Sequence, residues 1–207
     1  MRRIETNEDL EEGAKWLVKR ESRFGKALKL IEEVPLRRRK DGFEALLDAI
    51  VGQQVSVAAG DAIWKRLKGA RLTGPRKVLA ASDDELRACG LSRQKTRYAR
   101  ALADAGINYR KLREASTDEV VERLTEVTGI GKWTAEIYCL FSLGHADAFA
   151  PGDLALQESA RVLFGLSERP SEKELRELSE KWSPWRGVAA RILWSYYRVA
   201  KEREGTR

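Results

Sequence analysis

Three Ser-x-x-Glu segments restrict the fold of this chain more than any other feature, because each marks the start of a helix. They begin at Ser82, Ser116 and Ser171. In each, the Ser hydroxyl can accept a hydrogen bond from an orphan amide of the first turn while the Glu side chain reaches back. Apolar residues recur at helical spacing in residues 43–51 and 120–127. Because the sequence lacks alternating strand patterns and Asn-Gly hairpin signals, it predicts an all-α fold.

The charge balance of the 207 residues is basic, with 39 Lys and Arg against 32 Asp and Glu, a net charge of +7. A basic balance favours a polyanionic partner such as nucleic acid, although a solubilising surface gives the same balance. The 43% hydrophobic content suffices for a core in one domain or two small lobes. Cys89 and Cys139 are far apart in apolar contexts, which fits free thiols and excludes a four-cysteine metal or iron–sulfur site.

Two segments are candidate boundaries between lobes, the basic run at 35–42 and the stretch at 144–151. They predict a central helical lobe over residues 40–145, and a second helical lobe formed by both chain ends, residues 1–39 plus 146–207. The N-terminus has no apolar run behind its arginines, and no stretch approaches the length of a membrane span. We therefore expect a soluble, cytoplasmic protein with no membrane partner.

The segment TGIG at residues 128–131 separates two amphipathic helical patterns. Gly129 and Gly131 allow positive φ and let a phosphate approach the backbone closely. The helix that follows presents its amides and the positive end of its dipole, and Lys132 and Thr134 add a charge and a hydroxyl. Such a hairpin contacts the backbone of DNA and not its bases, so it predicts positioning without sequence specificity.

Four segments in order resemble the helix-hairpin-helix (HhH-GPD) DNA glycosylases. They are FEALLDAIVGQQVSVAAGDAIWKRL, LTEVTGIGKWTAEIYCLF, AFAPGDLALQ and KWSPWRGVAARILWSYY. Together they are similar to the 3-methyladenine DNA glycosylase II branch. The resemblance implies a two-lobed helical fold with the active site in the cleft between the lobes. The best-known relative has an extra N-terminal β domain, but the residues before Phe43 have a helical pattern here, so we expect the compact form without that domain.

The same resemblance implies an enzyme of base excision repair that acts on double-stranded DNA containing damaged bases. It would flip out an alkylated base, such as 3-methyladenine or 7-methylguanine, and hydrolyse its N-glycosidic bond. It further implies a monomer, associated with the nucleoid, that leaves its abasic product to downstream enzymes.

By this resemblance the catalytic residue is Asp153. Breaking an N-glycosidic bond develops positive charge on the sugar, which an ionised carboxylate stabilises while it orients or deprotonates the attacking water. An Asp that follows Pro-Gly is also a good N-cap for a helix over residues 154–164, and the two roles are compatible.

Family members that also cut the DNA strand carry a lysine at the position of Trp133, where it forms a Schiff base with the sugar. Lys132 is one position away and on a helix points elsewhere. No cysteine cluster follows Asp153, so the family's iron–sulfur loop is missing. We therefore expect a monofunctional glycosylase without lyase activity and without an iron–sulfur cluster.

The resemblance makes Trp133 and Trp185 the walls of the base pocket, since indole faces attract an electron-poor or cationic base. The alternative for each is ordinary core packing, which we assign to the remaining tryptophans, Trp16, Trp64, Trp182 and Trp194. Ile137 falls where branch members have a tyrosine, so the pocket is expected to be less aromatic. The predicted pocket also includes Gln53 and Leu154.

Gln54 in the motif GQQVS matches the residue that fills the gap left by the flipped base. A solvent-facing helix end is the alternative. Lys95, near the start of a basic helical stretch at 90–102, is expected to hold backbone phosphate, or else to be part of a solvated basic face.

The resemblance implies no required cofactor, but it places a sodium or potassium ion on the hairpin carbonyls of Thr125, Val127 and Gly129. Two other functions stay open. One is a glycosylase for uracil, hypoxanthine or an oxidised purine, which pocket shape decides. The other is a non-catalytic helix-hairpin-helix DNA-binding module, which would need neither Asp153 nor the pocket tryptophans.

Overall fold

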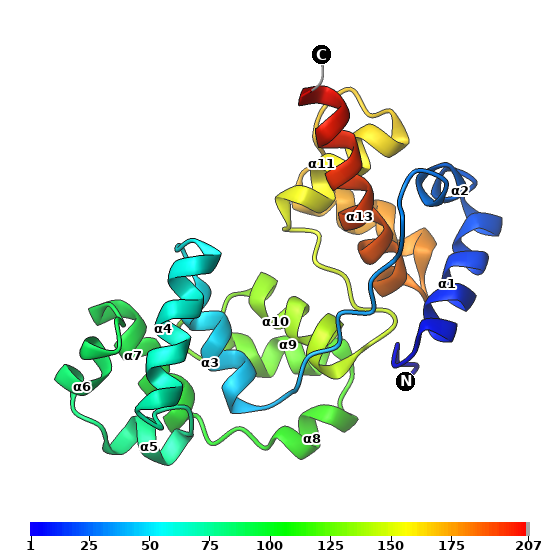
Figure 1. Ribbon diagram of the computed structural model, residues 1–207. Coiled ribbons are helices and arrows are strands. Elements are labelled where there is room, and N and C mark those ends of the chain that lie inside the picture. The colour runs from blue at the N-terminus through cyan, green and yellow to red at the C-terminus, as the bar shows by residue number, and fades with distance from the viewer. Residues whose placement is uncertain (206–207) are drawn as a thin grey trace. The chain divides into compact units, whose positions relative to one another are not determined.

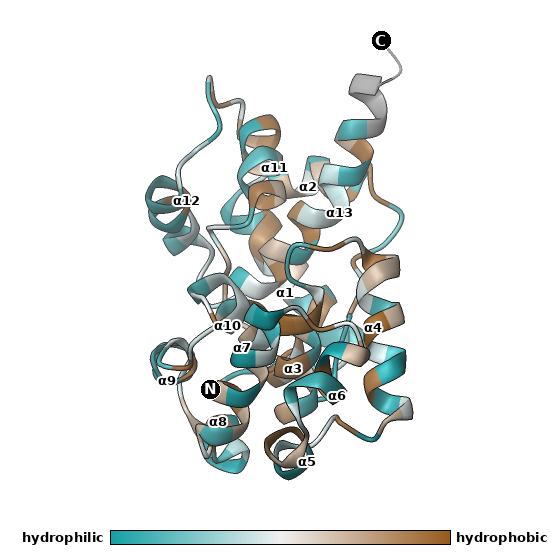
Figure 2. Cartoon of the chain, turned by 90° about the vertical axis from the view of Figure 1, so that its left-hand side faces the viewer, coloured by the Kyte–Doolittle hydropathy of each residue, from teal (hydrophilic) through white to brown (hydrophobic). Residues whose placement is uncertain are grey.

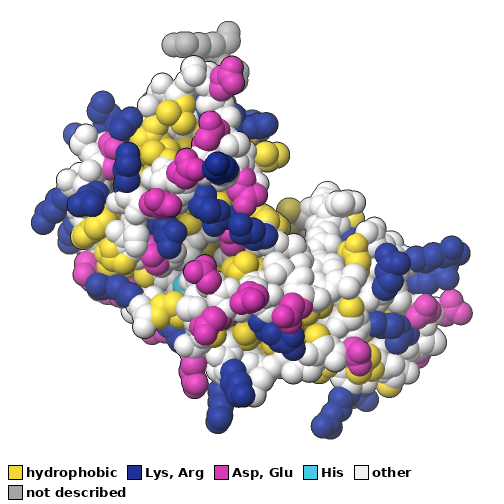
Figure 3. Space-filling model, turned by 180° about the vertical axis from the view of Figure 1, so that it is seen from behind, with side chains coloured by type: hydrophobic (Ala, Val, Ile, Leu, Met, Phe, Trp, Pro, Cys, Tyr) yellow, Lys and Arg dark blue, Asp and Glu magenta, His cyan; other side chains and the backbone are white. Residues whose placement is uncertain are grey.

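The computed structural model describes residues 1–205, with side chains through residue 201. Within that range every regular element is helical, and the only strand-like feature is an isolated antiparallel bridge between Arg3 and His145. This confirms the predicted all-α class. None of the helices described combines the length and apolar character that crossing a membrane requires. On the face shown in Figure 3, Lys and Arg side chains are interspersed with Asp and Glu.

The chain divides into two compact units. The central unit comprises Arg39–Tyr138, and the terminal unit comprises Met1–Arg38 with Cys139–Arg207. The sequence places the second boundary at residue 145, but the structure places it directly after Tyr138.

The central unit is built around one apolar helix, α3. α3 packs against α4, α7 and α10, and in Figure 2 much of its ribbon has the brown of hydrophobic residues. Its buried residues Leu46, Leu47, Ile50 and Val51 recur at helical spacing and so share one face. The helices of this unit (Figure 1) are α3 Phe43–Gly52, α4 Val57–Gly69, α5 Pro75–Ala80, α6 Asp83–Ala88, α7 Arg93–Asp104, α8 Tyr109–Glu114, α9 Thr117–Thr125 and α10 Lys132–Tyr138.

The terminal unit joins both ends of the chain around α13, which packs against α1, α2 and α11. Four aromatic rings fill its core, and the Trp182 ring lies 5.3 Å from Phe24, 5.4 Å from Phe164 and 5.5 Å from Phe149. Its elements are α1 Asn7–Arg20, α2 Arg23–Leu28, the π-helix η1 Cys139–Leu143, α11 Leu154–Phe164, α12 Glu172–Ser179, the 3₁₀-helix η2 Glu180–Trp182 and α13 Arg186–Gly205.

The unit boundary follows from the burial of η1. Helix α10 continues directly into η1, whose residues are all buried. Buried Arg191 of α13 donates to the carbonyl of Leu140 at 3.0 Å, and the ring of Phe141 packs on Trp194 at 5.5 Å. These contacts tie η1 to the terminal unit, which moves the boundary to the residue before η1.

The helix starts agree with the capping signals in the sequence. Complete capping boxes at Ser82, Ser116 and Ser171 begin α6, α9 and α12. A fourth box, in which Thr6 pairs with Asp9, begins α1. This box does not match the Ser/Thr-x-x-Glu/Gln pattern, because Asp9 takes the place of the usual Glu.

Candidate active site and DNA-binding hairpin

Asp153 caps the N-terminus of α11. Its Oδ1 accepts hydrogen bonds from the backbone amides of Ala155 at 3.0 Å and Leu156 at 3.1 Å. The indole Nε1 of Trp194 donates to the same oxygen at 3.1 Å. The half-buried carboxylate thus lies against three N–H donors and the positive end of a helix dipole, all of which stabilise negative charge there.

The loop that carries Asp153 is held by its own backbone and by one buried amide. The Asp153 amide donates to the carbonyl of Ala150 at 3.0 Å. Gln157, only 7% exposed, donates from Nε2 to the carbonyl of Pro151 at 2.8 Å. These contacts fix the turn before α11, so the carboxylate has a defined position.

Trp194 is a site residue that the sequence analysis assigned to the core. Its ring packs on Phe141, and the neighbouring carbonyl of Leu193 accepts from Ser159 Oγ at 2.7 Å, which links α13 to α11. This packing sets the indole nitrogen opposite Asp153. Nothing in the local sequence distinguishes Trp194 from the other tryptophans, because its partner lies on a helix far away in the chain.

Trp185, the predicted pocket wall, is a core residue. It is 2% exposed, and the guanidinium of Arg2 lies 4.2 Å above its ring. A Cβ placed on Gly13 of α1 would lie 2.7 Å from the ring, so α1 packs directly against it. The structure contradicts the pocket prediction for Trp185, because almost none of its ring is open to a ligand.

Two other predicted pocket residues are exposed apolar side chains. Leu154, the first residue of α11, is 63% exposed, and Trp133, the second residue of α10, is 47% exposed. Ile137, one turn after Trp133, is half-buried. Each of these residues is accessible within its own unit.

The two hairpin glycines differ in backbone conformation and in the space around them. Gly129 has φ +99°, and a Cβ there would lie 2.3 Å from Cγ of Tyr98 on α7. Gly131 has no positive φ, and a Cβ there would meet nothing within 4 Å. Folding therefore explains the glycine at 129 but not the one at 131, where the bare backbone borders open space.

Gln53 supports the hairpin. Its side-chain Nε2 donates to the carbonyl of Gly129 at 2.9 Å. The prediction placed Gln53 in the base pocket, but its amide is used to connect the end of α3 to the hairpin. This bond orients the turn that the sequence assigns to phosphate binding.

Gln54 lies at an exposed turn between α3 and α4 in a left-handed conformation, with φ +54°. Such a φ is uncommon for a residue other than glycine and is often found at functional sites. The apolar neighbours Val55 and Val57 are 39% and 82% exposed. A cavity of about 280 Å³ opens beside this turn and is lined in part by Gln53, Gln54, Gln94, Lys95 and Tyr98.

Two predicted phosphate contacts are corrected by the structure. The Lys95 ammonium donates to the carbonyl of Val51 at 2.6 Å, and burial lowers its pKa. Lys95 therefore caps the C-terminal end of α3. Thr134 is 6% exposed, so its side chain is largely covered. Lys132 is exposed at the start of α10, as the phosphate-binding prediction requires.

The carbonyls expected to hold a monovalent cation are partly used within the hairpin. The Val127 carbonyl accepts from the amide of Ile130 at 2.9 Å, and the Gly129 carbonyl accepts from Gln53. Each oxygen has two lone pairs, so both can still bind a cation together with Thr125. Among the residues described, no group of three or more His, Cys, Asp or Glu side chains is placed to hold a metal ion.

Comparison with known proteins gives consistent matches. Residues 47–184 match the family described as HhH-GPD superfamily base excision DNA repair protein. DNA-3-methyladenine glycosylase 1 of Schizosaccharomyces pombe is 31% identical over 171 residues, which cover 78% of this chain and 75% of that protein.

Two solved structures are similar throughout. The crystal structure of a DNA-3-methyladenine glycosidase from Bacillus halodurans has a TM-score of 0.83 at 33% identity, covering 92% of this chain and 91% of that one. The Schizosaccharomyces pombe 3-methyladenine DNA glycosylase in complex with abasic DNA has a TM-score of 0.77 at 28% identity, covering 88% and 95%.

Proposed function

The chain belongs to the HhH-GPD superfamily of base excision DNA repair proteins, and from that premise we propose that it is a DNA glycosylase acting on alkylated bases. The similar proteins are named for 3-methyladenine, and one was solved with abasic DNA, the kind of product that base removal leaves. We further assign it to the 3-methyladenine DNA glycosylase II branch.

The observation that carries the mechanism is the carboxylate of Asp153 on its three donors. As the bond between sugar and base breaks, positive charge develops on the sugar, and a fixed carboxylate stabilises it without reorganising. Asp153 also orients or deprotonates the attacking water. An alkylated purine that carries a positive charge leaves readily, so the reaction does not depend on a second acidic side chain.

We propose that the enzyme releases the base with water and does not cut the strand. The exposed side chain at the second position of α10 is Trp133, which offers no amine to form a Schiff base. Lys132 precedes it by one residue and so points in another direction. The product is then an intact abasic site, which an abasic-site processing enzyme must consume.

The central unit supplies the DNA-binding elements of this proposal. The bare backbone at Gly131 and the charge of Lys132 receive a backbone phosphate of double-stranded DNA. Gln54, on its exposed turn, fills the gap left by the flipped base. The enzyme then acts as a monomer at the nucleoid. It needs no cofactor, although the carbonyls of Thr125, Val127 and Gly129 offer a site for sodium or potassium.

The test is to incubate the protein with randomly methylated duplex DNA and to quantify the released bases by chromatography. We expect 3-methyladenine and 7-methylguanine. Borohydride added during the reaction should trap no covalent adduct, and an adduct would contradict the hydrolytic mechanism. If no methylated base is released, the alkylated-base assignment fails, and uracil, hypoxanthine and 8-oxoguanine duplexes decide between another lesion and a DNA-binding module.

A further inference from the structure

α7 carries basic side chains on a face that does not support the hairpin. On one side of the helix, Tyr98 lies against Gly129, and Gln94 donates from Nε2 to the Tyr98 hydroxyl at 2.5 Å. Arg93, Arg97 and Arg100 follow the spacing i, i+4 and i+7, which places them together on a different face. The hairpin geometry gives these arginines no role.

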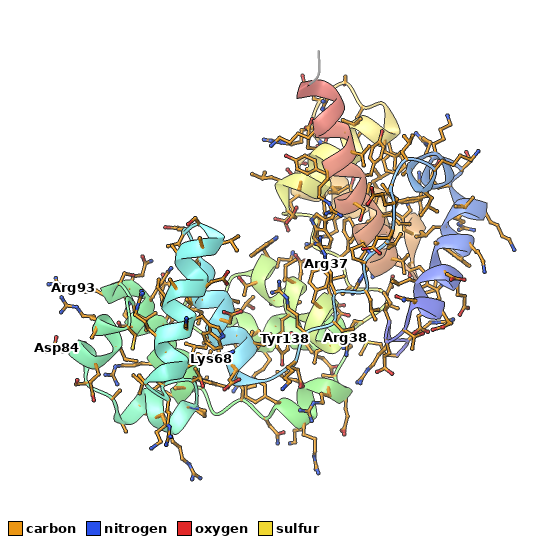
Figure 4. The ribbon with its side chains drawn as sticks, viewed as in Figure 1. Arg37, Arg38, Lys68, Asp84, Arg93 and Tyr138 are labelled. Carbon is orange, nitrogen blue, oxygen red and sulfur yellow. The ribbon has the colours of Figure 1, made fainter. Side chains whose placement is uncertain are left out.

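A cavity of about 410 Å³ lies on this arginine face. All of its lining residues come from α6 and α7, and Figure 4 shows Arg93 and Asp84 at this end of the central unit. The residues lining the cavity are Asp83, Arg87, Arg93, Thr96, Arg97 and Arg100. We call it the α6–α7 arginine cavity.

Two of its arginines already have partners. Arg100 donates to Asp83 Oδ1 from Nε at 3.1 Å and from Nη2 at 2.7 Å, and from Nη2 to the carbonyl of Ala81 at 2.6 Å. It thereby neutralises the one carboxylate of the cavity. Arg87 lies 3.7 Å from Asp84, whose side chain is 95% exposed, so this pair is weak.

The other two arginines have no acidic partner. Neither Arg93 nor Arg97 forms an ion pair with any residue that the structure describes, and Arg97 only lies 5.9 Å from the centroid of the Tyr98 ring. Two guanidinium groups on one cavity without a carboxylate create a positive potential that favours an anion.

Thr96 gives a second, independent indication of a ligand. It is 3% exposed, and its hydroxyl has no hydrogen-bond partner within the described part of the chain. Buried hydroxyl groups are nearly always hydrogen-bonded, and an exception indicates a missing water, ion or ligand. The unsatisfied hydroxyl lies between the two unpaired arginines in the sequence and belongs to the same cavity.

We propose that the α6–α7 arginine cavity binds a phosphate group. Arg93 and Arg97 supply charge and planar donors that match phosphate oxygens, and Thr96 donates its hydroxyl. The phosphate comes either from a DNA backbone or from a free phosphate or phosphate-bearing small molecule. Binding of a DNA phosphate in this cavity rests on the proposed function, because it would be a second DNA contact beside that of the hairpin. Binding of a free phosphate or a small phosphate-bearing molecule does not rest on it.

The first experiment uses inorganic phosphate and thermal unfolding. Phosphate should raise the Tm of the wild-type protein more than sodium chloride of equal ionic strength. The double variant Arg93→Gln with Arg97→Gln should lose this shift, and Thr96→Val should reduce it. Arg110→Gln is the matched control, because Arg110 is an exposed arginine on α8 outside the cavity. Thr96→Val removes an unpaired hydroxyl, so the variant should fold.

The second experiment measures binding to undamaged duplex DNA over a range of salt concentrations. If the cavity holds a DNA phosphate, the negative slope of the logarithm of the association constant against the logarithm of salt concentration should become about 0.9 less steep in the double variant. It should stay unchanged in Arg110→Gln. An unchanged slope with a phosphate-dependent Tm identifies a free phosphate or a small phosphate-bearing ligand.

The proposal is overturned if phosphate shifts the Tm no more than chloride and the double variant keeps the wild-type salt slope. Base release from methylated DNA is scored separately with wild-type protein. A wild type that releases no base refutes the glycosylase while leaving the cavity result intact.

Discussion

The indole nitrogen of Trp194 donates to Oδ1 of Asp153, the same carboxylate oxygen that caps α11. One oxygen therefore accepts from the helix it begins and from a second helix packed beside it. The fold and the proposed chemistry use the same side chain, and the two roles can be separated by substitution.

Replacing Trp194 by Phe should slow base release by roughly tenfold, because a hydrogen bond to an ionised carboxylate is lost. Phe keeps an aromatic ring against Phe141, so the Tm should change little. The rate is measured in single turnover on methylated duplex DNA. Trp64→Phe is the control, since Trp64 lies on α4 in the other unit. A wild-type rate for Trp194→Phe would rule out a positioning role.

The hairpin glycines should respond differently to alanine. Gly129→Ala should lower the free energy of unfolding by about 2 kcal/mol or more, because it forces a side chain into Tyr98 at positive φ. Gly131→Ala should leave stability unchanged and weaken duplex binding by roughly tenfold, because a methyl group then stands where the phosphate approaches. Urea unfolding and fluorescence anisotropy measure the two effects. If both substitutions lower the free energy of unfolding equally, the conclusion that only Gly129 is required for folding is wrong.

Gln54→Gly tests whether Gln54 fills the gap that the flipped base leaves in the DNA. Glycine relieves the left-handed φ of +54°, so the free energy of unfolding should rise or stay within about 1 kcal/mol of the wild-type value. Base release from duplex DNA should nevertheless slow by about tenfold, because nothing fills the gap in the stack. Release from single-stranded methylated DNA serves as the control and should not change. A similar loss on both substrates would exclude gap filling.

His145 should make stability depend on pH. Burial, followed by the charges of Arg3, Arg38 and the N-terminus, lowers its pKa from 6.5 to about 4. The unfolded chain then binds a proton at a higher pH than the folded chain, so the free energy of unfolding falls as pH drops from about 7 to 4, by up to roughly 3 kcal/mol. His145→Gln should remove this contribution, visible as a flatter pH profile in chemical unfolding. If the free energies of unfolding of the wild type and of His145→Gln change with pH in parallel, His145 is not the source of the pH dependence.

The sequence predicted features that depend on neighbouring residues. A capping box needs only residues three positions apart, so the sequence alone predicted the starts of α6, α9 and α12 at Ser82, Ser116 and Ser171. The hairpin around Gly129 is equally local, as is the N-cap position of Asp153.

Features that depend on packing between distant segments were not predictable. Trp185 and Trp194 lie on or beside the same helix, yet one is covered by α1 and the other reaches Asp153. Lys95 was similarly predicted to bind phosphate, but it donates to the carbonyl of Val51 near the C-terminal end of α3. In each case the partner comes from a part of the chain that no local pattern identifies.

The most direct test of the account is Asp153→Asn, measured as base release from methylated duplex DNA. Asn keeps an oxygen for the donors of α11 and for Trp194, so the fold and the DNA affinity should be retained. Asp153→Ala should instead lose the cap, at a cost of about 1 kcal/mol. We expect Asp153→Asn to release bases at least about 100-fold more slowly than wild type, because the charge that stabilises the sugar cation is gone. Release at the wild-type rate by a folded, DNA-binding Asp153→Asn protein would contradict the assignment of Asp153 as the catalytic residue.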